Sequence, residues 1–221
     1  MRSETLVSDH VQSKHRSDHQ YLLSNWGQHN NVTLVAAICT SQSGLGLFKI
    51  SQEDGTARVR PATDGVAMIE TSLDTIVADY PAFEKANVIK IDTDGYDFEV
   101  IAGARELIAN NLPAVLFECD VFDSSSYVEN CLSTFEFFAK CGYQHFLLYD
   151  NLGFFFGQYS LVDLQPFKNL LIYQITGRRC YFDILLMREE DLAEFLLLEN
   201  NFFADIVSNL SLAQTIRVAM Q

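Results

Sequence analysis

Two pairs of acids follow two apolar segments of this chain. The members of each pair are two positions apart, and the pairs are Asp92 with Asp94 and Glu118 with Asp120. Both apolar segments are typical of strands, in which side chains two positions apart point to the same face. In an open α/β sheet, ligands bind outside the carboxyl ends of the strands. Neighbouring strands would therefore bring the four acids to one crevice, where carboxylates can act as general bases or attract a cationic group.

A structural interpretation of the first pair stays open at this point. Asp92 and Asp94 precede a helical pattern, and an aspartate at such a place can cap the free N–H groups of the helix. Capping explains one acid at one turn well. Because a second strand also ends in acids, we favour a shared crevice over two separate caps.

The hydrophobic pattern alternates strands with amphipathic helices. Strands are predicted over residues 32–39, 88–91, 114–117, 143–149 and 181–187, with a hairpin over 47–60. Helices are predicted over residues 73–80, 98–110, 126–142 and beyond 189. Residues 154–159 are either a further strand or a pocket-lining loop. This alternation implies right-handed β-α-β crossovers and a mostly parallel sheet. We predict a flexible polar lead over residues 1–20 and a single α/β domain with C-terminal helices over residues 21–221.

The composition fits a globular domain with an acidic surface. The chain has 221 residues, of which 48% are hydrophobic, and its formal net charge is −14. Such a surface repels nucleic-acid phosphates and anionic lipid, so we expect neither as a partner and favour a neutral or cationic small molecule. Five cysteines without C-x-x-C spacing, and a polar N-terminus without a signal peptide, indicate reduced thiols and a cytoplasmic location. The oligomeric state has no sequence signal.

One short string also matches the haloacid dehalogenase-like phosphatases. In that family an apolar strand is followed by D-x-D-G, and residues 89–95 fit this string. The family's motif normally opens the domain, and a later G-D-x-x-x-D completes its magnesium site. Here the string lies well inside the chain and no second motif follows it. The match is therefore short and incomplete.

A longer series of motifs resembles the FkbM-type methyltransferase family. The series comprises Leu73-Asp74 in a short helix, the segment from Val88 to Ala104 and the segment from Pro113 to Glu118. The family's core runs T-L-D, then a strand ending I-K-I-D-x-E-G-x-E, then a helix with L-x-G-A, then a strand ending in Glu. Asp94 and Asp97 stand where the family usually has Glu, which shortens their reach. The resemblance covers roughly residues 25–186, and its spaced elements agree in order.

This resemblance implies a class I, S-adenosylmethionine-dependent methyltransferase that acts on a hydroxyl of a small metabolite or sugar. The implied fold is a three-layer, Rossmann-like α/β domain. The family's cofactor site needs a glycine-rich turn after the first strand and an acid after the second, and neither pattern precedes Val32. The cofactor-binding residues therefore stay unassigned, and we expect the fold to lack its first two strands. Gly44 and Gly46 form a G-x-G string that precedes a hairpin, so a turn is predicted there.

The same resemblance gives roles to the residues around the acids. The candidate catalytic residues are Asp92, Asp94 and Glu118. One of the two aspartates would orient the acceptor hydroxyl or act as its base, with a divalent metal ion as an optional aid. Glu118 would hold a neighbouring hydroxyl or tune the two aspartates. Gly95 would let the substrate approach closely, and Lys90 would pair with Asp92 on one strand face. No metal ligand is assigned. The alternative function is a non-catalytic binding or assembly module that keeps the back half of the fold.

Overall fold

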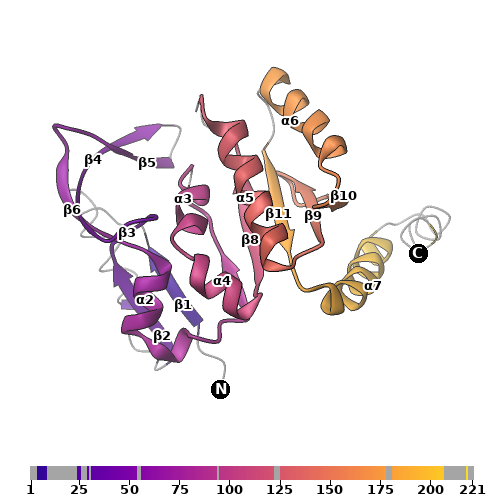
Figure 1. Ribbon diagram of the computed structural model, residues 1–221, viewed down its shortest axis with the longest axis horizontal. Coiled ribbons are helices and arrows are strands. Elements are labelled where there is room, and N and C mark those ends of the chain that lie inside the picture. The colour runs from indigo at the N-terminus through magenta and orange to yellow at the C-terminus, as the bar shows by residue number, and fades with distance from the viewer. Residues whose placement is uncertain are drawn as a thin grey trace.

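The structure is a computed structural model with three hydrogen-bonded sheets (Figure 1). It describes residues 4–8, 24–25, 29, 31–53, 56–93, 95–121, 125–177, 181–206 and 218. The largest sheet has five strands, in the order β10 (Phe155–Ser160), β9 (His145–Asp150), β11 (Phe182–Leu186), β8 (Ala114–Cys119) and β7 (Val88–Lys90). The four-stranded sheet has the order β3 (Ile38–Cys39), β6 (Val66–Thr71), β4 (Gly44–Glu53) and β5 (Thr56–Pro61), and the third sheet pairs β1 (Glu4–Ser8) with β2 (Val32–Ala36).

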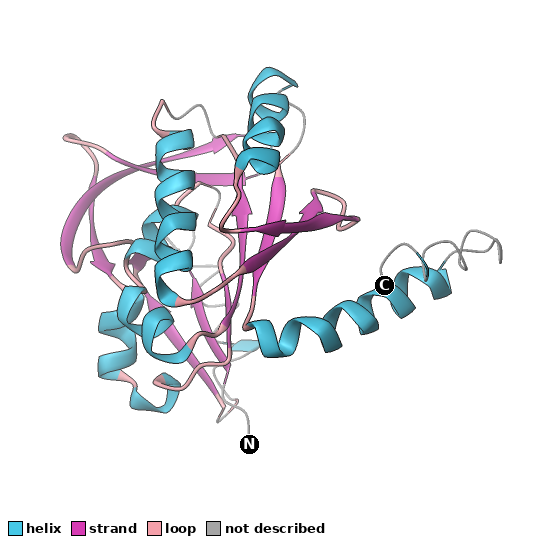
Figure 2. Ribbon diagram, turned by 45° about the vertical axis from the view of Figure 1, so that its right-hand side comes forward, coloured by secondary structure: helices cyan, strands magenta, loops and turns pink. Residues whose placement is uncertain are grey.

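Alternation along the strands of the largest sheet buries both of its faces. On one face, side chains of β8, β9 and β11 share a core with α3 (Asp97–Ala102), α4 (Arg105–Asn111), α5 (Tyr127–Cys141) and α6 (Gln165–Gly177). On the other face, Leu147, Tyr149 and Leu185 pack with residues of α7 (Glu189–Ile206). The predicted α/β class and its three layers are confirmed, and α7 projects from the body of the molecule at its far end (Figure 2).

The order of strands differs from the sequence-based expectation in one respect. β7 and β8 are parallel, and β8 and β9 run in the same direction because both are antiparallel to β11, which lies between them. The sheet is therefore mixed rather than mostly parallel. The last strand along the chain enters the middle of the sheet, which periodicity within a single segment cannot reveal because the pairing is non-local.

If the fold lacked its first two strands, β2 and β7 could pair directly with each other. The two do not pair: β7 is at an edge of the five-stranded sheet, and β2 instead pairs in parallel with β1. β1 lies inside residues 1–20, where only a flexible polar lead was expected. Residues 154–159 contain β10 rather than a pocket-lining loop, and the helix expected over residues 98–110 is divided into α3 and α4 at Gly103.

Asp74, the acid of Ser72-Leu73-Asp74 at the place of the family's T-L-D motif, fixes the short helix α2 (Leu73–Asp79) to α4. Its carboxylate accepts hydrogen bonds from the backbone N–H groups of Leu107 at 2.9 Å and Glu106 at 3.0 Å, at the start of α4. Its own N–H donates to the carbonyl of Gly103 at 2.9 Å. A Cβ on Gly103 would lie 2.1 Å from the carbonyl oxygen of Thr40. Asp74 and Gly103 thus hold α2, α4 and the backbone at Thr40 together.

We expect the substitution Asp74→Ala to lower the free energy of unfolding by about 1–2 kcal/mol, because two N–H groups of α4 lose their acceptor. The measurement is urea denaturation followed by circular dichroism. Asp79→Ala is the matched control, since this exposed aspartate ends the same helix and its carboxylate is unfavourable near the negative end of the helix dipole. Equal losses in the two variants would show that Asp74 does not act as a cap.

Candidate functional site

Asp92 forms an ion pair with Lys90 at the carboxyl end of β7. The two side chains lie on one face, as alternation predicts, and both are about half exposed, at 60% for Lys90 and 54% for Asp92. The hydrogen bond to Asp92 raises the pKa of Lys90, and the negative charges of Glu118 and Asp183 act in the same direction. The N-cap residue of α3 is Tyr96, which makes no side-chain cap, so Asp92 does not cap that helix. Asp94 lies outside the described residues.

Asp97, at the start of α3, organises the loop that follows β7. Its side chain is buried, with 3% exposure. One carboxylate oxygen accepts from the Thr93 hydroxyl at 3.1 Å and the Gly95 N–H at 3.4 Å, and the other accepts from the Glu118 N–H at 3.2 Å. Gly95 has a φ of +109°, a conformation that L side chains rarely adopt. Gly95 is therefore required by the backbone of this loop.

Asp97 is a site residue that the sequence analysis did not assign. Burial raises the pKa of its carboxyl group, while the three donated hydrogen bonds oppose that rise. The signal in the sequence was the position of Asp97 at the end of the family's I-K-I-D-x-E-G-x-E motif, where the family usually has a glutamate. Spacing alone could not show that this side chain turns inward toward the next strand.

Glu118 lies on the same sheet face as Lys90. Its neighbours Phe117 and Cys119 are in the buried core, so alternation turns Glu118 to the opposite face. Asp183 of β11 is its direct cross-strand partner in the sheet. Burial raises the pKa of Asp183, and the nearby charge of Asp92 raises it further. Asp183 was missed because only the non-local position of β11 brings it to this face.

A small hollow opens at the carboxyl ends of β7 and β8. Its volume is about 50 Å³, and its acidic lining residues are Asp97, Glu99, Glu118 and Asp120. The predicted crevice is therefore partly formed: Glu118 and Asp120 line it together with Gly95, whereas Asp92 does not. Among the described residues, no three His, Cys, Asp or Glu side chains are placed to hold a metal ion.

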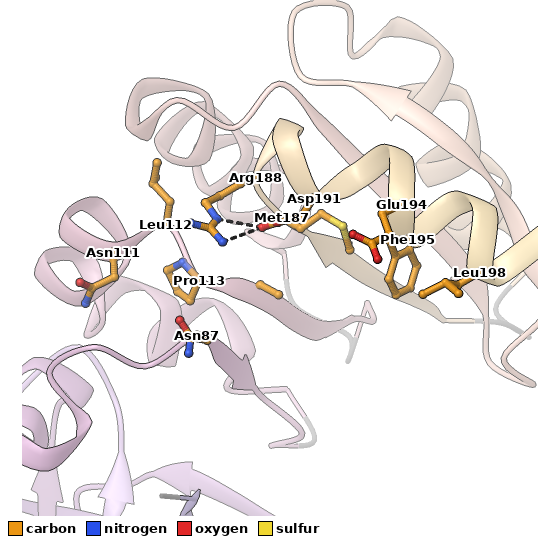
Figure 3. A pocket seen from close by; sticks show the side chains of 11 residues that line it. Asn87, Asn111, Leu112, Pro113, Met187, Arg188, Asp191, Glu194, Phe195 and Leu198 are labelled. Carbon is orange, nitrogen blue, oxygen red and sulfur yellow. Dashed lines mark hydrogen bonds and ion pairs between the residues drawn. The ribbon is translucent and has the colours of Figure 1, made fainter. Parts of the chain in front are cut away.

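A larger hollow of about 270 Å³ lies near the amino ends of β7 and β8, away from the acids (Figure 3). Leu112 and Pro113 line it together with Met187 and with Phe195 and Leu198 of α7. Arg188 is held at its rim by an ion pair with Asp191 at 2.8 Å. Ligands of open α/β sheets bind at the carboxyl ends of the strands. This hollow is therefore not the candidate catalytic site.

The described residues do not form a cradle for S-adenosylmethionine. Pockets for small molecules have volumes of roughly 300–1,000 Å³, far above that of the acidic hollow. A Cβ on Gly46 would lie 2.3 Å from the Phe48 ring, so packing inside the sheet explains this glycine. The G-x-G string is thus part of β4 and not a cofactor loop. Within the described part of the chain, no helix is long and apolar enough to cross a membrane.

The buried carboxylate of Asp97 gives a pH-dependent prediction. Its folded pKa is raised, so the folded state binds more protons than the unfolded state between the two pKa values, and stability falls as pH rises above about 3.9. We expect Asp97→Asn to remove this fall, so that the difference in unfolding free energy between variant and wild type shifts in the variant's favour with rising pH. Urea denaturation across pH 4–7 measures it.

The exposed Asp79 supplies the control for this measurement. Asp79→Asn makes the same chemical change at an exposed position, so it measures the effect of the substitution away from the buried site. A difference from wild type that changes no more with pH for Asp97→Asn than for Asp79→Asn would contradict an elevated pKa at Asp97.

Comparison with known proteins gives one family. The model described as the methyltransferase FkbM domain matches residues 9–145, more than half of the chain. The crystal structure of methyltransferase FkbM from Methylobacillus flagellatus KT is similar at 14% identity and a TM-score of 0.41, covering 66% of this chain and 32% of that one. The chain thus spans about a third of that protein's length. No curated protein sequence matches it. The chain belongs to the FkbM methyltransferase family.

Proposed function

We propose that this chain serves in the transfer of a methyl group from S-adenosylmethionine to a hydroxyl oxygen of a small metabolite or sugar. The observation that carries the proposal is the acidic end of β7 and β8 in a chain that belongs to the FkbM methyltransferase family. The family match covers the D-x-D-G string, so the haloacid dehalogenase-like alternative has no independent support.

Asp92 is the proposed base or orienting group for the acceptor hydroxyl. Its side chain is about half exposed and points into solvent beside Lys90, so an acceptor can reach it without a rearrangement of the core. Lys90 fixes the direction of the carboxylate through this ion pair. A base must lie within hydrogen-bond reach of the proton that it removes, and an exposed carboxylate at a strand end meets that condition.

Glu118 and Gly95 complete the proposed acceptor surface. Glu118 would accept a hydrogen bond from a second hydroxyl, on the same face as Lys90 and Asp92. Gly95 presents backbone without a side chain at the rim of the acidic hollow. Asp94, which follows Asp92 by two positions, keeps its proposed role as the alternative base. The acids favour a neutral or cationic acceptor, because an anionic one would be repelled.

The second candidate function is a binding or assembly module without catalysis. It is favoured by the small volume of the acidic hollow, about 50 Å³. The two candidates differ in whether the chain binds the cofactor at all.

Isothermal titration calorimetry with S-adenosylmethionine and with its demethylated product separates these candidates. The proposed function predicts saturable binding with a dissociation constant in the micromolar range, roughly −8 kcal/mol. Adenosine and methionine, added separately, are the controls for non-specific binding. Absence of any heat of binding at millimolar ligand would reject the enzyme and support the module.

Asp92→Asn tests the role of the proposed base. Methyl transfer from labelled cofactor to a panel of small polyhydroxylated acceptors should fall by about 10²–10⁴-fold, because a general base contributes that much. Asp64→Asn is the control, since Asp64 is also exposed and also pairs with a lysine, Lys49, but lies in the turn between β5 and β6 of the four-stranded sheet. Turnover that is the same in both variants would remove Asp92 from the reaction.

A further inference from the structure

One face of α7 leaves large apolar side chains in solvent. Glu194, Leu198 and Phe202 follow helical spacing, four positions apart, and form a continuous band, called here the helix stripe. Leu198 is 61% exposed and Phe202 is 59% exposed. An adjacent face of α7 packs on the sheet, through Leu192, Phe195 and Phe203. The helix stripe is therefore not needed for the core of this chain.

The helix stripe begins at the larger hollow and continues along the projecting part of α7. Glu194, Phe195 and Leu198 lie side by side on the helix where it faces the hollow (Figure 3). Arg188 is engaged by Asp191 and Glu190, at 2.8 and 3.2 Å. Glu194 makes no ion pair within the described part of the chain. The helix stripe thus combines apolar side chains with an uncompensated negative charge.

The four-stranded sheet carries a second exposed apolar surface. Leu45 and Leu47 of β4 and Ile69 of β6 lie on one face, because Leu45 is paired directly with Ile69 and neighbouring side chains alternate. They are 77%, 45% and 59% exposed, whereas Phe48, on the other face, is buried. We call these three residues, together with Lys49 and Arg60, the sheet patch.

The sheet patch has positive charge in a chain whose net charge is −14. Lys49 and Arg60 are direct cross-strand partners and therefore share the face of Leu47. Lys49 pairs with Asp64 at 2.7 Å, while Arg60 forms no ion pair with any residue that the structure describes. The sheet patch thus has the same make-up as the helix stripe with the opposite sign of charge.

The two surfaces cannot meet within one chain. The four-stranded sheet and α7 lie at opposite ends of the molecule (Figure 1). Contiguous apolar surfaces with charged edges mark interaction sites in soluble proteins. Packing a helix on a sheet face is also one of the standard ways in which proteins bury apolar side chains.

We propose that the helix stripe of one copy of this chain docks on the sheet patch of a second copy. Leu198 and Phe202 would cover Leu45 and Ile69, and Glu194 would pair with Arg60. The contact joins two different surfaces, so it is heterologous and can continue from copy to copy. The proposal is independent of methyl transfer, because neither surface includes the acids at the ends of β7 and β8.

Sedimentation velocity over a range of protein concentrations tests the assembly. The wild-type chain should show species larger than a monomer at about 100 µM, with association weakened at high salt. Leu198→Asp and Leu45→Asp should each weaken association by at least about tenfold, since each places a charge in an apolar contact. Val162→Asp is the control, because Val162 is 93% exposed and lies on neither surface.

Mixing the two variants shows whether the surfaces bind each other. Each variant retains one intact surface, so an equimolar mixture of Leu198→Asp and Leu45→Asp should form a complex of two chains and nothing larger. Glu194→Arg and Arg60→Glu should likewise weaken association singly and restore it when combined in one chain. A monomeric wild type, a mixture that stays monomeric, or association that survives Leu45→Asp but not Leu198→Asp would overturn the proposal.

Discussion

The buried carboxylate of Asp97 is the interaction on which the acidic end of the sheet depends. It joins the loop after β7 to the end of β8, because one oxygen holds Thr93 and Gly95 and the other holds the backbone of Glu118. Burial of a carboxylate costs free energy unless hydrogen bonds satisfy it. The three donors make this burial tolerable and fix the spacing between the two strand ends. The hydrogen bonds of Asp97 therefore limit where the exposed acids at those strand ends can lie.

Sheet alternation then divides the acids between two environments. Lys90 and Glu118 point to the sheet face opposite α3 and α5, where Lys90 and Asp92 are about half exposed, whereas Asp97 belongs to the side of the main core. A half-exposed carboxylate such as Asp92 is accessible to a ligand, while a buried one such as Asp97 serves as a structural acceptor. The chain therefore has one acid suited to meet a ligand and another suited to hold the backbone, within a few residues of each other.

The sequence was sufficient for features that depend on local periodicity. The strand before Asp92, the pairing of Lys90 with Asp92 and the helices α2 and α5 follow from residue spacing. Features that depend on distant partners were not predictable in this way. Asp183 reaches the site because β11 enters between β8 and β9, and Asp97 turns inward because the Glu118 N–H needs an acceptor. The family resemblance placed Asp97 correctly in order but could not give its partner.

The position of β7 links the fold to the question of function. Its place at the sheet edge means that one side of its backbone pairs with no strand among the described residues. Edge strands present backbone groups that can pair with another strand. The acids of the candidate site follow directly from this edge, so any strand added there would lie beside them. A complete cofactor site is therefore compatible with the geometry of β7, even though the described residues do not build one.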